Sequence, residues 1–192
     1  MQGLTKLRQI ANHPQMVDKS YEGDSGKFED VVHTVMSVLA RGHRALIFSQ
    51  FVKQLDIYRR YFDAEHITYA YLDGATKNRG EVVKEFQEQA DIKLFLISIK
   101  AGGAGLNLTQ ADYVFILDPW WNPAVEQQAI DRTHRIGQTK NVFIYKFITK
   151  DTVEEKILAL QNRKRSVAES LITTEESFTK SLSVQDIQDI LQ

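Results

Sequence analysis

The stretch KLFLISIKAGGAGLNLTQADYVFILDPWW (residues 93–121) decides how this chain folds. Two mostly apolar runs within it, Lys93–Ile99 and Tyr113–Leu117, have the length and the content of β-branched and aromatic residues that are typical of strands. Neither run alternates regularly between polar and apolar residues, which indicates strands buried on both faces of a parallel sheet. A glycine-rich segment joins the two runs. The stretch therefore predicts two core strands of a parallel sheet.

The same alternation of strand and helix extends to both sides of this stretch. Further strands are predicted at Ala45–Phe48, Ile67–Leu72 and Val142–Ile148, and helices at Lys27–Ala40, Val52–Phe62, Gly80–Gln89, Ala124–Ile136 and Val153–Leu171. Five strands separated mostly by helices predict an α/β fold, a parallel sheet with helices on both faces. Right-handed crossovers would then place four loops at one edge, where ligands of such sheets bind. These loops are SQF (49–51), DGATKNR (73–79), IKAGGAG (99–105) and DPWWNP (118–123).

The composition limits the classes of protein to which the chain can belong. With 192 residues, 43% of them hydrophobic and 26% charged, it suits one globular domain with a sizeable core. A net charge of −1 argues against a protein that coats nucleic acid, although a local basic groove remains possible. The absence of cysteine excludes disulfides and thiolate metal sites. The five histidines show no metal-binding spacing, so we expect no metal, and no apolar run is long enough to predict a membrane span.

A predicted helix at Glu126–Gln138, reading EQQAIDRTHRIGQ, carries the most informative charges. At about 100° per residue, Gln128, Arg132 and Arg135 share one face of this helix. Two neighbouring arginines repel each other unless an anion lies opposite, and the guanidinium fork matches phosphate oxygens well. The alternative is a solvated charged face that Glu126 and Asp131 neutralise locally.

Two nucleotide-binding motifs are incomplete in this chain. The segment Ala101–Asp112 contains part of a G-x-G-x-x-G pattern, but it leaves no room for the helix that would bind a pyrophosphate. The segment Asp24–Lys27 suggests a P-loop, but Tyr21 replaces its first glycine and Phe28 replaces the Ser or Thr that would bind magnesium. The chain therefore has no evident means of holding a nucleoside triphosphate and its metal by itself.

Several motifs resemble the Swi/Snf family of DNA-translocating ATPases in helicase superfamily 2. These are GHRALIFSQF (42–51), YLDGAT with Arg79, SIKAGGAGLNLTQADYVFILDPWWNP (98–123) and QQAIDRTHRIGQ (127–138). They are similar in order and spacing to the family's second, C-terminal RecA-like lobe. The resemblance implies an inter-lobe junction at 1–25, a RecA-like lobe at 26–150 and a brace-like helix and tail at 151–192.

The resemblance also implies how the chain takes part in ATP hydrolysis. ATP with Mg²⁺ would be held mainly by an N-terminal RecA-like lobe of the same full-length protein, which this chain does not contain. The second lobe would supply arginine fingers, here Arg132 and Arg135 with Gln128 beside them. A loop containing Gly103 and Gly105 would approach the nucleotide or the DNA strand closely, because glycine has no Cβ to obstruct the contact.

Double-stranded DNA is the second partner that the resemblance implies. Its backbone would be contacted by residues of the strand-end loops, namely Ser49, Gln50, Lys77, Arg79, Lys100 and Trp121. Trp121 has packing within its own loop as an alternative. The sequence departs from the family at Ile99-Lys100, where Thr-Arg is usual, so a bidentate phosphate contact becomes a point charge.

The functional prediction is therefore one half of an ATP-dependent DNA translocase that is inactive in isolation. The alternative is a non-catalytic RecA-like module that binds DNA or a protein. We expect a cytoplasmic or nucleoid location if the protein is bacterial, and a nuclear one if it is eukaryotic.

Overall fold

The structure is a computed structural model, and it describes residues 2–23, 25–102, 106–120, 126–127, 130–131 and 140–164. Its helices are α1 (Gln2–Asn12), the 3-10 helix η1 (Pro14–Met16), α2 (Gly26–Ala40), α3 (Val52–Ala64), α4 (Arg79–Glu88), α5 (Ile99–Gly102) and α7 (Val153–Lys164). Its strands are β1 (Ala45–Ser49), β2 (Tyr69–Leu72), β3 (Leu94–Ser98), β4 (Tyr113–Ile116) and β5 (Phe143–Lys146).

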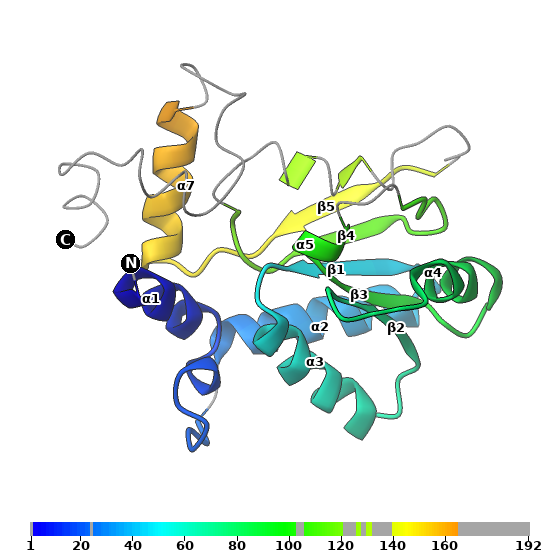
Figure 1. Ribbon diagram of the computed structural model, residues 1–192, viewed down its shortest axis with the longest axis horizontal. Helices are drawn as coiled ribbons and strands as arrows, with labels where there is room; N and C mark the ends of the chain where they lie inside the picture. The colour runs from blue at the N-terminus through cyan, green and yellow to red at the C-terminus, as the bar shows by residue number, and fades with distance from the viewer. Residues whose placement is uncertain are drawn as a thin grey trace.

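The five strands form one parallel sheet in the order β2-β3-β1-β4-β5 (Figure 1). The predicted parallel sheet is therefore confirmed, and each observed strand lies within a residue or two of its predicted bounds. Ser49 at the end of β1 lies opposite Ser98 at the end of β3, and Phe48 lies opposite Ile116 of β4. The carboxyl ends of these strands consequently meet at one edge of the sheet, as the sequence predicted.

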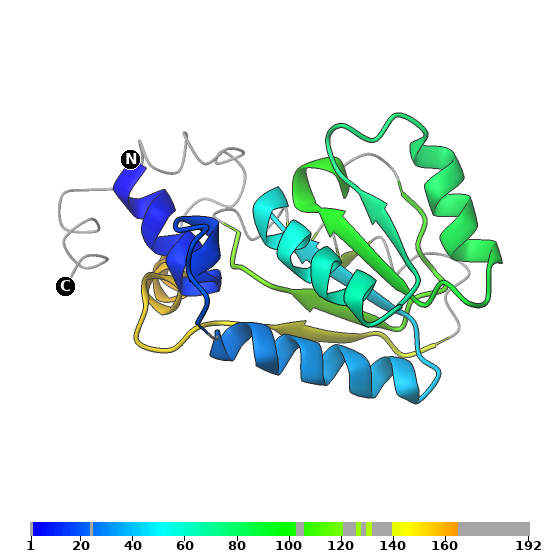
Figure 2. The same cartoon turned by 90° about the horizontal axis from the view of Figure 1, so that it is seen from below.

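Helices cover both faces of the sheet. Successive strand side chains point to opposite faces, so Ile47 of β1 faces α2 and α3, whereas Phe48 faces the opposite core. Figure 2 shows α2 and α3 side by side over one face. Phe86 of α4 belongs to the core of the other face. Fully burying each such side chain stabilises the fold by roughly 1.5–3 kcal/mol.

The prediction that the strands are buried on both faces is wrong for β5, which lies at one edge of the sheet. Phe143, Ile144 and Tyr145 are exposed to 47%, 43% and 43%. The difference arises because β5 pairs only with β4 and forms the edge of the sheet. The ring of Phe143 stacks on Tyr113 of β4 with centroids 5.1 Å apart, so part of its surface is still shielded.

The helix α2 begins and ends where local sequence signals place it. Ser25 caps its start by accepting a hydrogen bond from the Phe28 backbone N–H at 3.4 Å. Val31 and Val35 on its predicted apolar face are fully buried. After the last turn, Gly42 takes a φ of +84°, a left-handed conformation that suits glycine and lets the chain turn into β1.

The segment predicted as a junction, residues 1–25, is more ordered than a linker. Its helix α1 lies beside α7 in both Figure 1 and Figure 2. Thr149, just before α7, donates its hydroxyl to the Ala11 carbonyl at 2.8 Å. The helix ends before Pro14, because His13 is extended and the proline ring disfavours a helical residue before it. The first segment is therefore docked on the domain.

The helical extension after β5 is present as α7, whose described part ends at Lys164. Residues 165–171 of the predicted helix, and the rest of the predicted tail, lie outside the described residues.

Candidate functional site

The candidate site is the carboxyl edge of the sheet. The structure brings Gln50, Lys77, Arg79 and Lys100 to the loops and helix starts that follow β1, β2 and β3. Lys77 and Lys100 are exposed, while Gln50 and Arg79 are half-buried. These four side chains remain candidates for contacts with phosphate groups. Residues 99–102 were predicted as loop, but they form the single helical turn α5 immediately after β3.

The loop that presents Lys77 is held rigidly by Asp73. Its carboxylate accepts hydrogen bonds from the backbone N–H groups of Ala75 and Thr76 at 2.9 and 3.0 Å, and from the Tyr71 hydroxyl at 3.0 Å. Partial burial acts to raise the pKa of Asp73, but these hydrogen bonds outweigh it and hold the pKa below its usual value. The turn is therefore organised before any ligand arrives.

The prediction that the Ser49 side chain contacts a DNA phosphate does not fit the structure. Ser49 is fully buried, and its hydroxyl donates to Asp118 Oδ2 at 2.6 Å. The other carboxylate oxygen of Asp118 accepts the Gln50 backbone N–H at 3.1 Å. Ser49 and Asp118 thus join the ends of β1 and β4 and fix the backbone from which Gln50 projects. The Ser49 hydroxyl is therefore engaged within the protein and is not presented to a ligand.

Six predicted site residues lie outside the described residues. They are Arg132, Arg135 and Gln128 of the predicted arginine helix, Gly103 and Gly105 of the glycine-rich loop, and Trp121.

The described part of the predicted arginine helix is anchored in the core. Glu126 is 1% exposed, forms an ion pair with Lys146 Nζ at 2.8 Å, and accepts the Trp120 backbone N–H at 3.2 Å. Ile130, one turn later, is also buried. Glu126 therefore does not belong to a solvated face, as the alternative interpretation required. It ties the start of this segment to β5 and to the loop after β4.

A buried polar cluster that sequence reasoning missed lies behind the candidate edge. It consists of Arg8, Asn12, Lys27, Ser49, Gln54, Asp118 and Glu154, each at most 9% exposed. At its centre, Lys27 Nζ lies 2.6 Å from Glu154 Oε2 and 2.9 Å from Asn12 Oδ1. Gln54 Nε2 also donates to Asn12 Oδ1, at 2.9 Å. The cluster joins α1, α2, α3 and α7, which are far apart in the sequence.

Arg8 links α1 to the loop after β4. It is fully buried, and its Nη2 donates to the Pro119 carbonyl at 2.8 Å. Its guanidinium carbon lies 5.4 Å from the centroid of the Phe51 ring, within the range of a cation–π contact. Pro119 precedes the segment that contains the predicted arginine helix. The first helix is therefore in direct contact with the loop that leads into the predicted catalytic residues.

Burial dominates the electrostatics of this cluster. Desolvation raises the pKa of Asp118 despite the hydrogen bond from Ser49 and the nearby positive charge of Arg8. It likewise raises the pKa of Glu154 and lowers the pKa of Lys27, although the two side chains attract each other. Each charge is thus costly to bury and depends on its partners.

The position of Lys27 also explains why the P-loop interpretation fails. A P-loop lysine reaches phosphate oxygens, whereas this ammonium group is committed to Glu154 and Asn12. A signal for the burial was available in the sequence, because Lys27 shares the apolar face of its helix with Val31 and Val35 at intervals of four residues. No comparable pattern in the sequence indicates that Glu154 is the ion-pair partner of Lys27.

Among the described residues, no group of three or more histidine, cysteine, aspartate or glutamate side chains is arranged to hold a metal ion. None of the helices in the described part of the chain has the length and hydropathy to cross a membrane.

Comparison with known families identifies this architecture. Residues 26–137 match the family described as "Helicase conserved C-terminal domain". The chain belongs to this family. Its matched region runs from α2 through the predicted arginine helix, so it includes every residue that we assigned to the nucleotide and the DNA.

The relatives of this helicase C-terminal domain are ATPases of the SWI2/SNF2 type. It is 39% identical to the DNA repair protein RAD5A of Arabidopsis thaliana over 167 residues, which cover 86% of this chain and 16% of that protein. It is 39% identical to the human chromatin-remodeling ATPase INO80 over 170 residues, which cover 88% of this chain and 11% of that protein. The chain thus spans less than a fifth of these relatives.

A solved structure is similar to this chain over nearly its whole length. The SWI2/SNF2 ATPase core of Sulfolobus solfataricus, solved in complex with dsDNA, is 33% identical, with a TM-score of 0.81. The match covers 98% of this chain and 41% of that one. The predicted resemblance to the C-terminal RecA-like lobe of Swi/Snf ATPases is confirmed.

Proposed function

We propose that this helicase C-terminal domain is one half of the active site of a DNA-dependent ATPase that moves along double-stranded DNA. The observation that carries the proposal is the likeness to the SWI2/SNF2 core bound to dsDNA, which extends over 98% of the chain and includes the docked helix α1. The organised carboxyl edge, with exposed Lys77 and Lys100, provides a surface where two ligands can meet.

In this proposal Arg132 and Arg135 act as arginine fingers, and Gln128 lies beside them. They stabilise negative charge on the γ-phosphate as it leaves, for which a donated arginine provides about 10³–10⁵ in rate. This corresponds to roughly 4–7 kcal/mol of transition-state stabilisation. Gly103 and Gly105 would allow the backbone to approach the nucleotide closely. The burial of Glu126 and its ion pair with Lys146 argue against the alternative in which Glu126 belongs to a solvated charged face.

ATP and Mg²⁺ would be held mainly by an N-terminal RecA-like lobe. The P-loop-like lysine, Lys27, supports this division, because its ammonium group is buried in an ion pair with Glu154. When bound, the metal would neutralise phosphate charge. This chain's own contribution is to close over the phosphates with cationic groups.

Double-stranded DNA would be contacted along its backbone by Gln50, Lys77, Arg79, Lys100 and Trp121. Such contacts position a protein without reading the base sequence, and they weaken steeply with salt. Cycles of closure and opening around ATP would shift one lobe along the duplex relative to the other. A protein with this activity would reside in the nucleus or the nucleoid.

The test compares the 192-residue chain with the same chain fused behind its N-terminal ATP-binding lobe. Steady-state ATP hydrolysis is measured with and without duplex DNA. We expect no turnover by the isolated chain and DNA-stimulated turnover by the two-lobe protein. Turnover by the isolated chain above background would show that the active site is not divided in this way.

The finger assignment is tested in the two-lobe protein with Arg135→Ala. We expect a loss of turnover of about 10³-fold or more with unchanged DNA binding. Lys84→Ala on the exposed surface of α4 is the matched control, and it should leave turnover unchanged. Near-full turnover of the Arg135 variant would contradict the assignment. Duplex binding without any turnover of the two-lobe protein would instead favour a non-catalytic binding module.

A further inference from the structure

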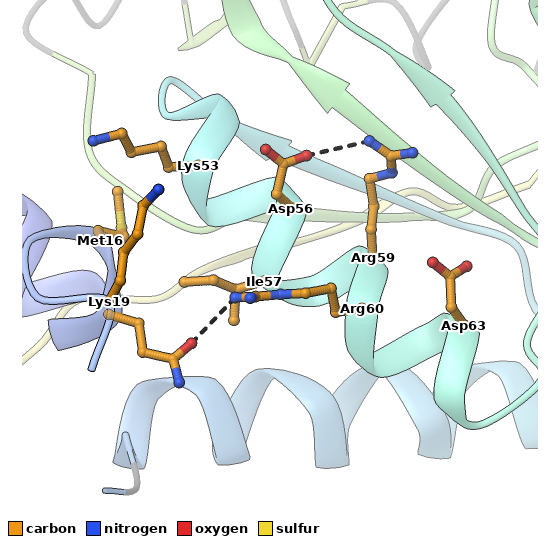
Figure 3. Close-up of a pocket in the computed structure, with 9 residues that line it drawn as sticks. Met16, Lys19, Lys53, Asp56, Ile57, Arg59, Arg60 and Asp63 are labelled. Carbon is orange, nitrogen blue, oxygen red and sulfur yellow. Dashed lines mark hydrogen bonds and ion pairs between the residues drawn. The ribbon is translucent and has the colours of Figure 1, made fainter. Parts of the chain in front are cut away.

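A groove lies between α3 and the segment around η1, and no residue that we assigned to the nucleotide or the DNA is among those that line it. Figure 3 shows this groove, which has a volume of about 530 Å³, in the size range of pockets that hold ligands. Its lining includes two largely buried apolar side chains, Met16 at the end of η1, which is 3% exposed, and Ile57 of α3, which is 8% exposed. We call it the α3 groove. Nothing in the proposed ATPase cycle uses it.

Cationic side chains border the α3 groove. Lys19 approaches from the chain after η1, while Lys53 and Arg60 project from α3 (Figure 3). All three are exposed, and within the described residues neither lysine has a carboxylate at ion-pair distance. Arg60 is only partly engaged, since its Nη2 donates to the neutral Gln15 side chain at 3.1 Å. These three cations are available to an anionic partner.

The acidic side chains of the groove are already committed. Asp56 forms an ion pair with Arg59 at 3.2 Å, and Asp63 accepts the Tyr69 hydroxyl at 2.8 Å. Four lining side chains are cationic and two are acidic, so the groove carries a net positive charge in a chain whose overall charge is −1. The positive charge is therefore concentrated here and is not a general property of the surface.

Apolar surface continues beyond the groove. Val17 and Val52, the sequence neighbours of Met16 and Lys53, are exposed to 41% and 39%. Apolar contact surface within a cationic border is a combination that recognises peptides with both acidic and apolar side chains. We propose that the α3 groove docks an acidic peptide segment of a partner protein, with an apolar side chain of that segment covering the exposed Val17 next to Met16.

A peptide fits this groove better than duplex DNA does. Every nucleotide of a duplex carries a phosphate, so its backbone would meet Asp56 and Asp63 as well as the cations, and it would leave the exposed Val17 uncovered. A peptide can place its acidic residues against Lys19, Lys53 and Arg60 and leave neutral residues opposite the two aspartates. The mixed charge and the apolar surface thus favour a peptide.

The three methionines of the chain provide a direct probe of this proposal. They are Met1, Met16 and Met36, and only Met16 lines the groove, whereas Met36 packs against the core on α2. The 192-residue chain is prepared with ¹³C-methyl methionine and titrated with a synthetic peptide composed of Asp, Glu and Leu. Two matched peptides serve as controls, one with serine in place of leucine and one with amides in place of the acids.

We expect the acidic leucine peptide to shift the Met16 methyl signal and to leave the Met36 signal in place. Both control peptides should bind at least about tenfold more weakly, because each lacks one of the two contacts. Lys53→Glu and Arg60→Glu should each weaken binding by about tenfold. Lys84→Glu, on the exposed surface of α4, should leave binding unchanged. Circular dichroism verifies that all three variants are folded.

Three results would overturn the proposal. The first is that the acidic leucine peptide leaves the Met16 signal unmoved or binds the Lys53 and Arg60 variants equally well. The second is that a short duplex DNA shifts the Met16 signal in place of the peptide, which would make the groove a nucleic-acid surface. The third is a Met16 shift that depends on protein concentration alone, which would identify a second copy of the chain as the occupant.

Discussion

The contacts at the amino-terminal end of the parallel sheet differ in kind from the contacts at its carboxyl end. At the amino-terminal end, Asp112 accepts the Arg44 backbone N–H at 3.0 Å and contacts His43 Nδ1 at 2.6 Å, while the Arg44 guanidinium donates to backbone carbonyls near the end of α4. His43 remains 36% exposed there. At the carboxyl end, by contrast, Lys27 of α2 and Glu154 of α7 form a buried ion pair.

This difference indicates where the molecule depends on its charges. Water can replace a lost partner at the exposed amino end, whereas a charge left alone in the interior retains its full desolvation cost. The buried charges also lie on the side where α1 contacts the loop after β4. We expect substitutions at the carboxyl end to have larger effects on stability than substitutions at the amino-terminal end.

The largest expected effect is that of Lys27→Met. It leaves the fully buried Glu154 carboxylate without its ion-pair partner, which should lower the free energy of unfolding by about 3–5 kcal/mol in a urea titration. Adding Glu154→Gln should recover much of this loss, because the glutamine is neutral and can still accept the Thr149 backbone N–H. A loss below about 1 kcal/mol for the single variant would show that the buried pair is not critical.

A matched pair of variants compares the two ends directly. Asp118→Ala removes the acceptor of the buried Ser49 hydroxyl and should cost about 3 kcal/mol, whereas Asp112→Ala should cost about 1–2 kcal/mol because water can reach His43. Both are measured by urea unfolding under the same conditions. Equal losses of stability would show that the carboxyl end is no more sensitive to the loss of a polar partner than the amino-terminal end.

A smaller effect is expected at Arg44. Its guanidinium donates to the carbonyls of Phe86 and Gln89 at 2.6 and 2.8 Å, which a single ammonium group cannot reproduce with the same geometry. Arg44→Lys should therefore cost about 1 kcal/mol in thermal or urea unfolding. A loss as large as that of Lys27→Met would contradict the view that this end is held by replaceable contacts.

The smallest effect is a pH dependence at His13. Burial, followed by the nearby charge of Arg60, lowers the pKa of His13 below 6.5, and its Nδ1 accepts the Gln15 backbone N–H at 3.2 Å. As the pH falls below 6.5, the unfolded chain binds a proton before the folded one does, so this residue's contribution to stability declines. His13→Asn keeps a side-chain acceptor but does not titrate. The variant should lose less stability than the wild type between pH 7 and pH 5, and equal slopes would exclude this role of His13.

Much of the fold could be predicted because it depends on local patterns. The apolar runs around Ile47, Leu96 and Phe115 predicted three neighbouring strands, and the spacing of Val31 and Val35 predicted the buried face of α2. The exposure of β5 could not be predicted, since nothing in the run around Ile144 shows that its strand lies at the edge. Apolar periodicity shows that a strand exists, but not which neighbours it has.

The candidate site, like the fold, could be predicted only in part. The alternation of strands and helices predicted which loops gather at the carboxyl edge, and the structure brings Gln50, Lys77 and Lys100 there. The sequence did not predict that Ser49 is buried against Asp118, because a polar residue at a strand end can either face a ligand or bond to a neighbouring strand. The roles of Arg132 and Arg135 remain predictions.

The strands, the helices and the family to which the chain belongs could be inferred from the sequence, since they follow from short-range periodicity and from contiguous motifs. Only the tertiary structure decided which polar residues are buried together. Arg8 and Pro119 are 111 residues apart, and Lys27 and Glu154 are 127 residues apart. The pairing of such groups depends on how α1 and α7 dock across the end of the sheet. No local sequence pattern predicts this pairing, because the two members of each pair are distant in the sequence and meet only in the folded protein.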